Sequence, residues 1–166
     1  MSAKNVVLVT GSQGVSRGAA VQHCRIPDTK VYGLSRREAA PGVGVEHISV
    51  DLLNAADVRQ KLETTRNITH IVFGAYIEKP TATEKSQVNV AILRNLLDVV
   101  EATSPLLKHI TFYQGGKAYG ADLGPFKTPA REDDPRLMPP NFYYDQEDFL
   151  RERQQGKQWH WTALRP

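Results

Sequence analysis

Near its start the chain reads Val6-Val7-Leu8-Val9-Thr10-Gly11-Ser12-Gln13-Gly14-Val15, an apolar run followed at once by a glycine-rich turn. A short, almost continuous apolar run is typical of a central parallel strand that is buried on both faces. Glycines directly after such a strand let the backbone turn tightly and approach a pyrophosphate, whose charge the next helix amino terminus favours. We therefore predict a cofactor-binding loop at Gly11, Gln13, Gly14 and Val15.

The loop departs from the common glycine spacing at its third position. Arg17 stands where that glycine is expected, and Gly18 follows one place later. An arginine there can meet a phosphate, or it can obstruct the cofactor and the packing of helix against strand. Because the glycines follow the first strand, the pattern favours cofactor binding over a plain turn.

Apolar runs and helical patterns alternate along the rest of the chain. The sequence predicts further strands at 31–35, 45–50, 69–73, 109–113 and 159–164, and helices at 19–24, 54–62, 83–102 and 143–154. Residues 121–140 hold five prolines and are expected to form a long loop. This order predicts an α/β fold, a Rossmann-type doubly wound parallel sheet of about six strands with helices on both faces. All 166 residues are assigned to one NAD(P)-binding domain.

Composition and charge narrow the class of partner. The chain is 40% hydrophobic with a net charge of +3, and its basic residues are scattered, which argues against nucleic acid and anionic membranes. No apolar stretch approaches the ~18 residues that span a bilayer, and the amino terminus has no signal-peptide pattern. Cys24 is the single cysteine, and the five histidines lack ligand spacing, so we expect no disulfide and no metal site. A cytoplasmic location is expected.

The ends of the later strands carry candidate cofactor contacts. The second strand ends in Ser35, Arg36 and Arg37 rather than in an acid, which favours the 2′-phosphate of NADP(H) over the 2′-hydroxyl of NAD. The alternative is an exposed basic turn. The other predicted contacts are Asp51 and Leu52 at the adenine edge, Ala75 and Tyr76 beside the ribose and nicotinamide, and Gln114 after the fifth strand.

A lysine after the fifth strand and a tyrosine at a helix start suit reductive chemistry. An ammonium can lower a nearby phenol's pKa from its usual value of ~10, and the phenol can then stabilise a developing oxyanion. Tyr113 and Lys117 have Tyr-x-x-x-Lys spacing, but that pair needs one helix, and here a strand end and Gly115-Gly116 intervene. Any functional pair therefore joins Lys117 to the helix start across space.

Several segments together carry a family resemblance. They are Gly11-Ser12-Gln13-Gly14-Val15, Ser35-Arg36-Arg37, Asp51-Leu52, Gly116-Lys117-Ala118-Tyr119-Gly120, Glu132-Asp133-Asp134-Pro135-Arg136, Asn141-Phe142-Tyr143-Tyr144 with Glu147-Asp148, and Leu164-Arg165-Pro166. On these segments the chain resembles the progesterone 5β-reductase and iridoid synthase group. This group is an atypical branch of the extended short-chain dehydrogenases/reductases, with members described as NAD-dependent epimerase/dehydratase-like.

The resemblance implies a reaction and a catalytic pair. It maps the family's lysine onto Lys117 and the catalytic tyrosine onto Tyr143, the first of the adjacent pair. The implied activity is conjugate reduction, in which NADPH delivers hydride to the β-carbon of a small-molecule enone or enal. Tyr143 would stabilise the enolate oxygen, and Lys117 would orient the cofactor and tune the tyrosine. Tyr144 is expected to be a packing residue, and residues 132–136 a structural loop.

Two other functions stay open. Family members continue well past the Arg-Pro at which this chain stops, so the resemblance implies that the C-terminal part, with most of the substrate pocket, is missing. One alternative is therefore a catalytically inactive NADP-binding module or a truncated fragment. Another is a different extended dehydrogenase or sugar-nucleotide epimerase, against which the absence of a lysine four residues after Tyr143 counts. A homodimer is left open.

Overall fold

A single parallel sheet organises the chain. The computed structural model describes residues 4–12, 26–37 and 44–165. Within these residues six strands pair in the order β3-β2-β1-β4-β5-β6, all parallel to their neighbours. The strands are β1 (Asn5–Thr10), β2 (Thr29–Ser35), β3 (Val45–Ser49), β4 (His70–Phe73), β5 (His109–Tyr113) and β6 (His160–Leu164). The predicted strand positions and the doubly wound order are confirmed.

The described helices are three α-helices, each preceded by a residue whose side chain accepts hydrogen bonds from free backbone N–H groups, and one 3₁₀ helix without such a cap. They are α2 (Ala55–Leu62), α3 (Ala82–Thr103), α4 (Phe142–Arg153) and the short 3₁₀ helix η1 (Gly116–Tyr119). Asn54 caps α2, Thr81 caps α3 in a reciprocal capping box, and Asn141 caps α4. The predicted helix at 19–24 lies outside the described residues.

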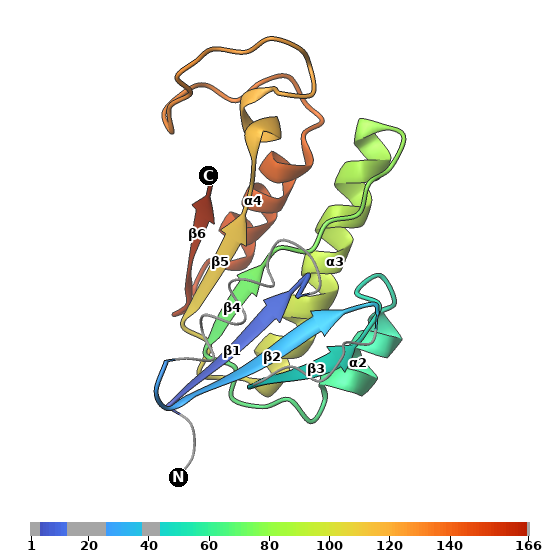
Figure 1. Cartoon of the computed structure of the whole chain (residues 1–166), viewed down its shortest axis with the longest axis vertical. Coiled ribbons are helices and arrows are strands. Elements are labelled where there is room, and N and C mark those ends of the chain that lie inside the picture. Colours follow the sequence, from blue (N-terminus) through green and yellow to red (C-terminus); the bar gives the residue numbers. More distant parts are fainter. Residues whose placement is uncertain (1–3, 13–25, 38–43, 166) are drawn as a thin grey trace.

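The described helices pack on one face of the sheet. Figure 1 shows α3 and α4 running side by side across it, with α2 near β3. Their apolar side chains join strand residues such as Leu8, Phe73 and Phe112 in the main core. The alternate strand residues, whose side chains point to the other face of the sheet, form a second buried cluster that includes Val9 and Val72. Helices on both faces were predicted, and the helix predicted at 19–24 is not among the described residues.

The chain reverses its direction of travel across the sheet between β1 and β4. From β1 the strands proceed to β2 and β3 on one side, whereas from β4 they proceed to β5 and β6 on the other. In parallel sheets such a reversal opens a crevice at the carboxyl ends of the two central strands, where ligands bind. The long loop that precedes α4 also lies beyond these strand ends, at the top of Figure 1.

No helix in the described part of the chain has the length and apolarity needed to cross a membrane.

Candidate functional site

A cavity of about 350 Å³ opens at the carboxyl ends of β1, β2 and β4. Eight of the residues predicted to contact a cofactor line it: Gly11, Ser35, Arg36, Arg37, Asp51, Leu52, Ala75 and Tyr76. The parallel order explains this convergence, because residues that directly follow neighbouring parallel strands meet at one edge of the sheet. Gln13, Gly14 and Val15, and the displaced Arg17, lie outside the described residues.

Gly11 brings β1 and β4 close together at the cavity. Its φ is +69°, in the left-handed region that favours glycine, and a Cβ there would lie 2.9 Å from the carbonyl oxygen of Gly74. The hydroxyl of the buried Thr10 accepts hydrogen bonds from the N–H groups of Gly74 (3.0 Å) and Ala75 (3.1 Å). The backbone after β4 is therefore held directly against the start of the glycine-rich turn.

Replacing Gly11 by alanine is expected to lower the free energy of unfolding by about 2 kcal/mol or more, because strain and a backbone clash add together. Gly156 is the matched control, since its φ is +73° but nothing lies within 4 Å of a Cβ there. Gly156→Ala should cost only the strain, about 1 kcal/mol. Urea unfolding measures both changes, and equal losses would contradict the close approach at Gly11.

The basic turn after β2 is fixed by two serine hydroxyls. Ser35 donates to the carbonyl oxygen of Arg37 (2.7 Å), and Ser49 donates to that of Arg36 (3.1 Å). Both arginine side chains are exposed at the cavity. The turn thus presents two guanidinium groups whose backbone is held in place.

Two asparagines of α3 hold the other walls of the cavity. Asn95 donates to the carbonyl oxygen of Leu52 (2.9 Å), next to Asp51. The fully buried Asn89 exchanges two hydrogen bonds with the backbone of Ile77, at 2.9 Å and 2.7 Å. Sequence reasoning missed both residues, although a polar residue within the buried face of an apolar helix is a signal that could have found Asn89.

Lys117 lies on η1, directly after β5. Its ammonium donates to the hydroxyl of Tyr76 (3.0 Å) and to the carboxylate of Glu78 (3.3 Å). Its carbonyl oxygen accepts from the side chain of Asn141 (2.9 Å), which also caps α4. Lys117 is therefore tied both to the cavity wall at Tyr76 and to the start of the tyrosine-bearing helix.

Tyr143, in the first turn of α4, is half-buried among aromatic rings. Its ring centroid lies 4.0 Å from that of Phe142 and 6.1 Å from that of Phe112. Its hydroxyl would lie 3.6 Å from a Cβ at Gly115, so the phenol faces the backbone between β5 and η1. No hydrogen bond joins Tyr143 to Lys117 in the described part of the chain; the fold brings the two residues to the same region only.

The pKa of Tyr143 is shifted in the direction opposite to the lowering that a nearby ammonium would produce. Burial raises the pKa of the Tyr143 phenol, and the nearby Lys117 charge, which lowers it, offsets only part of this effect. The net pKa therefore lies above the usual value rather than below it. At neutral pH Tyr143 keeps its proton and is a hydrogen-bond donor.

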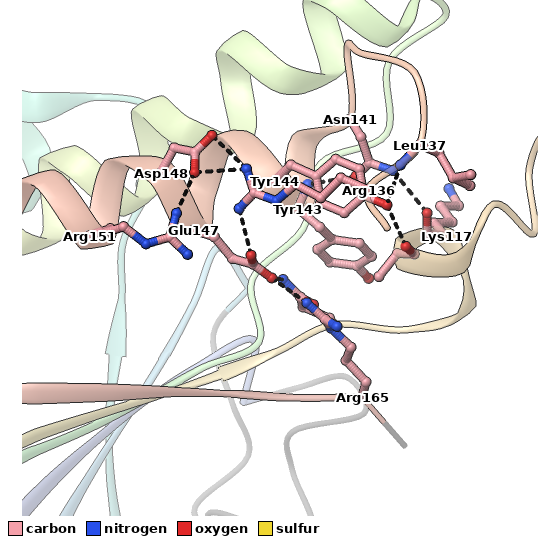
Figure 2. Close-up of polar contacts among 12 residues, drawn as sticks. Lys117, Arg136, Leu137, Asn141, Tyr143, Tyr144, Glu147, Asp148, Arg151 and Arg165 are labelled. Atoms are coloured by element: carbon pink, nitrogen blue, oxygen red, sulfur yellow. Dashed lines mark hydrogen bonds and ion pairs between the residues drawn. The ribbon is translucent and has the colours of Figure 1, made fainter. Parts of the chain in front are cut away.

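Three segments of the family resemblance meet at Glu147, on α4. Figure 2 shows Arg136 between Glu147 and Asp148, and Arg165 on the other side of Glu147. The Glu147 carboxylate, whose side chain is only 6% exposed, accepts from Arg136 (2.7 Å) and Arg165 (2.6 Å). Burial raises its pKa, but the hydrogen bonds from Arg136, Gln114 and Arg165 outweigh burial and hold that pKa below its usual value.

Gln114 and Tyr144 lie next to this group of ion pairs. The Gln114 amide donates to Glu147 (2.7 Å), and Gln114 does not line the cavity, so its contact with a cofactor stays a prediction. Tyr144 is buried, and its hydroxyl donates to the carbonyl oxygen of Ala118 (2.6 Å), as a packing residue would. Within the described residues no group of His, Cys, Asp and Glu is arranged to hold a metal ion.

The parallel sheet and the cavity at its strand ends together define a Rossmann-type domain. The family model described as "PRISE-like Rossmann-fold domain" matches residues 38–166, and the chain belongs to this family. The resemblance to the progesterone 5β-reductase and iridoid synthase group is thereby confirmed.

Curated relatives agree with this assignment. The chain is 34% identical over 172 residues to the short chain dehydrogenase gsfE of Penicillium aethiopicum, covering 95% of this chain and 45% of that protein. It is 34% identical to the (S)-8-oxocitronellyl enol synthase ISY2 of Nepeta racemosa, with coverages of 97% and 44%. It is 32% identical to the 3-oxo-Δ(4,5)-steroid 5-β-reductase of Arabidopsis thaliana, with coverages of 90% and 42%. The chain thus spans less than half the length of these relatives.

Solved structures share the fold. A short-chain dehydrogenase/reductase superfamily protein from Agrobacterium tumefaciens with bound NAD aligns with a TM-score of 0.74 at 22% identity, over 97% of this chain and 48% of that one. The UDP-glucose 4-epimerase of Bifidobacterium longum, in complex with NAD+ and UDP, aligns with a TM-score of 0.75 at 21% identity, over 97% and 52%. At these identities the likeness extends to the fold alone.

Proposed function

We propose that the chain is the cofactor-binding part of an NADP(H)-dependent reductase that acts on the activated C=C bond of a small enone or enal. One observation carries the proposal. The cavity at the strand ends is lined jointly by Gly11, Arg36, Arg37 and Tyr76, and Lys117 is hydrogen-bonded to Tyr76. The enol synthase and steroid reductase among the relatives support the reaction class.

The residues around the cavity fit a dinucleotide. Gly11 lets the start of the glycine-rich turn pack against the backbone of Gly74 at the cavity, and the turn at Arg36 and Arg37 offers two cationic groups to a 2′-phosphate. Asp51 and Leu52 would border the adenine, whereas Ala75 and Tyr76 would border the ribose and nicotinamide. Gln13, Gly14 and Val15 would hold the pyrophosphate.

The chain's own contribution to the chemistry is the stabilisation of developing charge. The reduced nicotinamide would supply a hydride to the β-carbon of the substrate. The electron pair of the C=C bond then moves toward the carbonyl, so negative charge builds on that oxygen. Tyr143, which keeps its proton at neutral pH, would donate to this oxygen, while water supplies the proton that completes the α-carbon. Lys117 would hold the cofactor and keep a positive charge near the enolate.

The double variant Arg36→Ala with Arg37→Ala is expected to weaken NADPH binding about tenfold or more, because charge-assisted hydrogen bonds to the 2′-phosphate are lost. NADH binding should change little. Titrating both cofactors against the purified chain by calorimetry measures this. Arg66→Ala, at an exposed arginine before β4 and therefore at the opposite end of the sheet, is the control. No NADPH binding by the wild type would overturn the proposal, and binding without any turnover would favour an inactive cofactor module.

A further inference from the structure

The carboxylate of Glu78 contacts side chains from three separate parts of the fold. Its carboxylate accepts a short hydrogen bond from the hydroxyl of Tyr76, pairs with Lys85 of α3 at 2.5 Å, and pairs with Lys117 of η1 at 3.3 Å. Lys117 also donates to Tyr76, which closes a three-membered ring of hydrogen bonds. Neither the family resemblance nor the spacing of motifs assigns any role to Glu78.

The donor and acceptor roles in this ring follow from chemistry. An ammonium only donates and a carboxylate only accepts, so the Tyr76 hydroxyl must donate to Glu78 and accept from Lys117. Hydrogen bonds from Lys85 and then from Tyr76 lower the pKa of Glu78 to about 2, so it is a carboxylate at neutral pH. Burial, followed by the hydrogen bond to Glu78, raises the pKa of Tyr76 to about 12. Tyr76 therefore keeps its proton on the Glu78 side and turns a lone pair toward Lys117.

The two tyrosines of the site differ in whether the hydroxyl proton is already used in a hydrogen bond. Tyr76 has its only proton committed to Glu78, whereas the Tyr143 proton is not committed to any residue in the described part of the chain. The three rings are contiguous, because the ring centroid of Phe142 lies 5.1 Å from that of Tyr76 and 4.0 Å from that of Tyr143. The Lys117 ammonium, which is hydrogen-bonded to Tyr76, thus lies on the side of the cavity where α4 begins.

We infer that Glu78 is a positioning residue: together with Tyr76 it holds the ammonium of Lys117 at the edge of the cofactor cavity, beside Tyr143. Its negative charge also lies between two ammonium groups, those of Lys85 and Lys117, which would otherwise repel each other. The inference rests on the proposed function for what Lys117 does. The placement of Lys117 itself is testable on the chain without cofactor.

The first test measures Lys117 directly in the cofactor-free chain. Glu78→Gln is expected to raise the rate of Lys117 acetylation by sulfo-NHS acetate about fivefold, because an ion pair and the alignment of Tyr76 are lost. Glu78→Asp, which keeps the charge, should restore most of the protection. Glu46→Gln is the matched control, since Glu46 and Glu78 have the same side-chain exposure, 58%, and each pairs with a lysine. Peptide mass spectrometry gives the rate at each lysine.

The second test reads Tyr76 spectroscopically. In ¹³Cζ-tyrosine NMR spectra, assigned with Tyr76→Phe, wild-type Tyr76 should be mostly unionised at pH 11, below its midpoint of about 12. In Glu78→Gln its midpoint should fall toward the ordinary value of about 10, because the neighbouring carboxylate is gone while Lys85 and Lys117 remain. Unchanged Lys117 acetylation together with an unchanged Tyr76 midpoint, in a variant that circular dichroism shows to be folded, would overturn the inference.

The third test separates positioning from the proposed function. In NADPH oxidation with cyclohexenone, Glu78→Gln should lower kcat about tenfold with little change in the enone KM, and Glu78→Asp should recover part of it. If Glu78→Gln raises the rate of Lys117 acetylation but leaves kcat unchanged, the positioning role is overturned. If the wild type binds no NADPH while Glu78→Gln still raises the rate of Lys117 acetylation, the proposed function fails. The inference that Glu78 and Tyr76 position Lys117 is then still supported.

Discussion

Tyr143→Phe is expected to lower kcat for NADPH-dependent reduction of cyclohexenone by about 10²- to 10³-fold, because the donor to the developing enolate oxygen is removed. The KM for NADPH should change little, since in the proposed reaction the phenol contacts the substrate oxygen and not the cofactor. The raised pKa of Tyr143 supports this role, because a protonated phenol can donate throughout the neutral range. Following NADPH absorbance at 340 nm measures the rate.

Tyr113→Phe is the matched control for that experiment. Tyr113 lies four residues before Lys117, in the familiar Tyr-x-x-x-Lys spacing, but it ends β5, and its side chain packs against the second core cluster. It should therefore retain nearly the wild-type rate. Equal rates in wild type and Tyr143→Phe would remove Tyr143 from the chemistry, and a large loss in Tyr113→Phe would reinstate the residue that the spacing suggests.

Glu147→Ala is expected to lower the free energy of unfolding by about 3 kcal/mol, because it leaves Arg165 and part of Arg136 without their counter-charge in a partly buried site. The lower end of the usual range applies, since the Arg136 side chain is 40% exposed. Asp148→Ala is the matched control: it also pairs with Arg136, but its side chain is 53% exposed, so the loss should stay below about 1 kcal/mol. Urea unfolding measures both, and similar losses would contradict the special position of Glu147.

The pH dependence of this stabilisation has a definite sign. Because the pKa of Glu147 is lowered in the folded chain, its contribution is fully present above the unfolded value of about 4.3. The contribution is lost as the pH falls through the lower, folded pKa. Below about pH 4.3 the wild type should therefore lose stability more steeply than Glu147→Gln, which has no charge to lose. Parallel curves would show that Glu147 does not titrate with folding.

Much of the fold could be predicted because its signals are local. Short apolar runs end at glycine or polar residues, and the helices start at capping residues such as Asn54, so element type and position follow from a few neighbouring residues. Among the elements of the described residues, η1 alone was not predicted: it is a single turn after Gly115, and the glycines at 115 and 116 interrupt any helical pattern there. The cavity residues were predictable for a related reason: parallel strands place whatever follows them at one edge.

The contacts of the two central side chains could not be predicted in this way. Lys117 contacts Tyr76 and Glu78, which are 41 and 39 residues away in the sequence. The ion pairs that join α4 to Arg165, directly after β6, and to Arg136 of the long loop involve side chains whose spacing shows no pattern. The direction of the Tyr143 pKa shift depends on the balance between burial and the Lys117 charge, two opposing effects that exist only once α4 has packed.

The order of residues along the chain was thus enough to predict a doubly wound parallel sheet and to bring Gly11 and Arg36 to one cavity, because backbone periodicity and strand direction depend on neighbouring residues. Packing established which groups Lys117 contacts. The lysine after β5 is held by Tyr76 and Glu78 and not by Tyr143, because hydrogen bonds between distant side chains form only where the folded backbone brings donor and acceptor within reach.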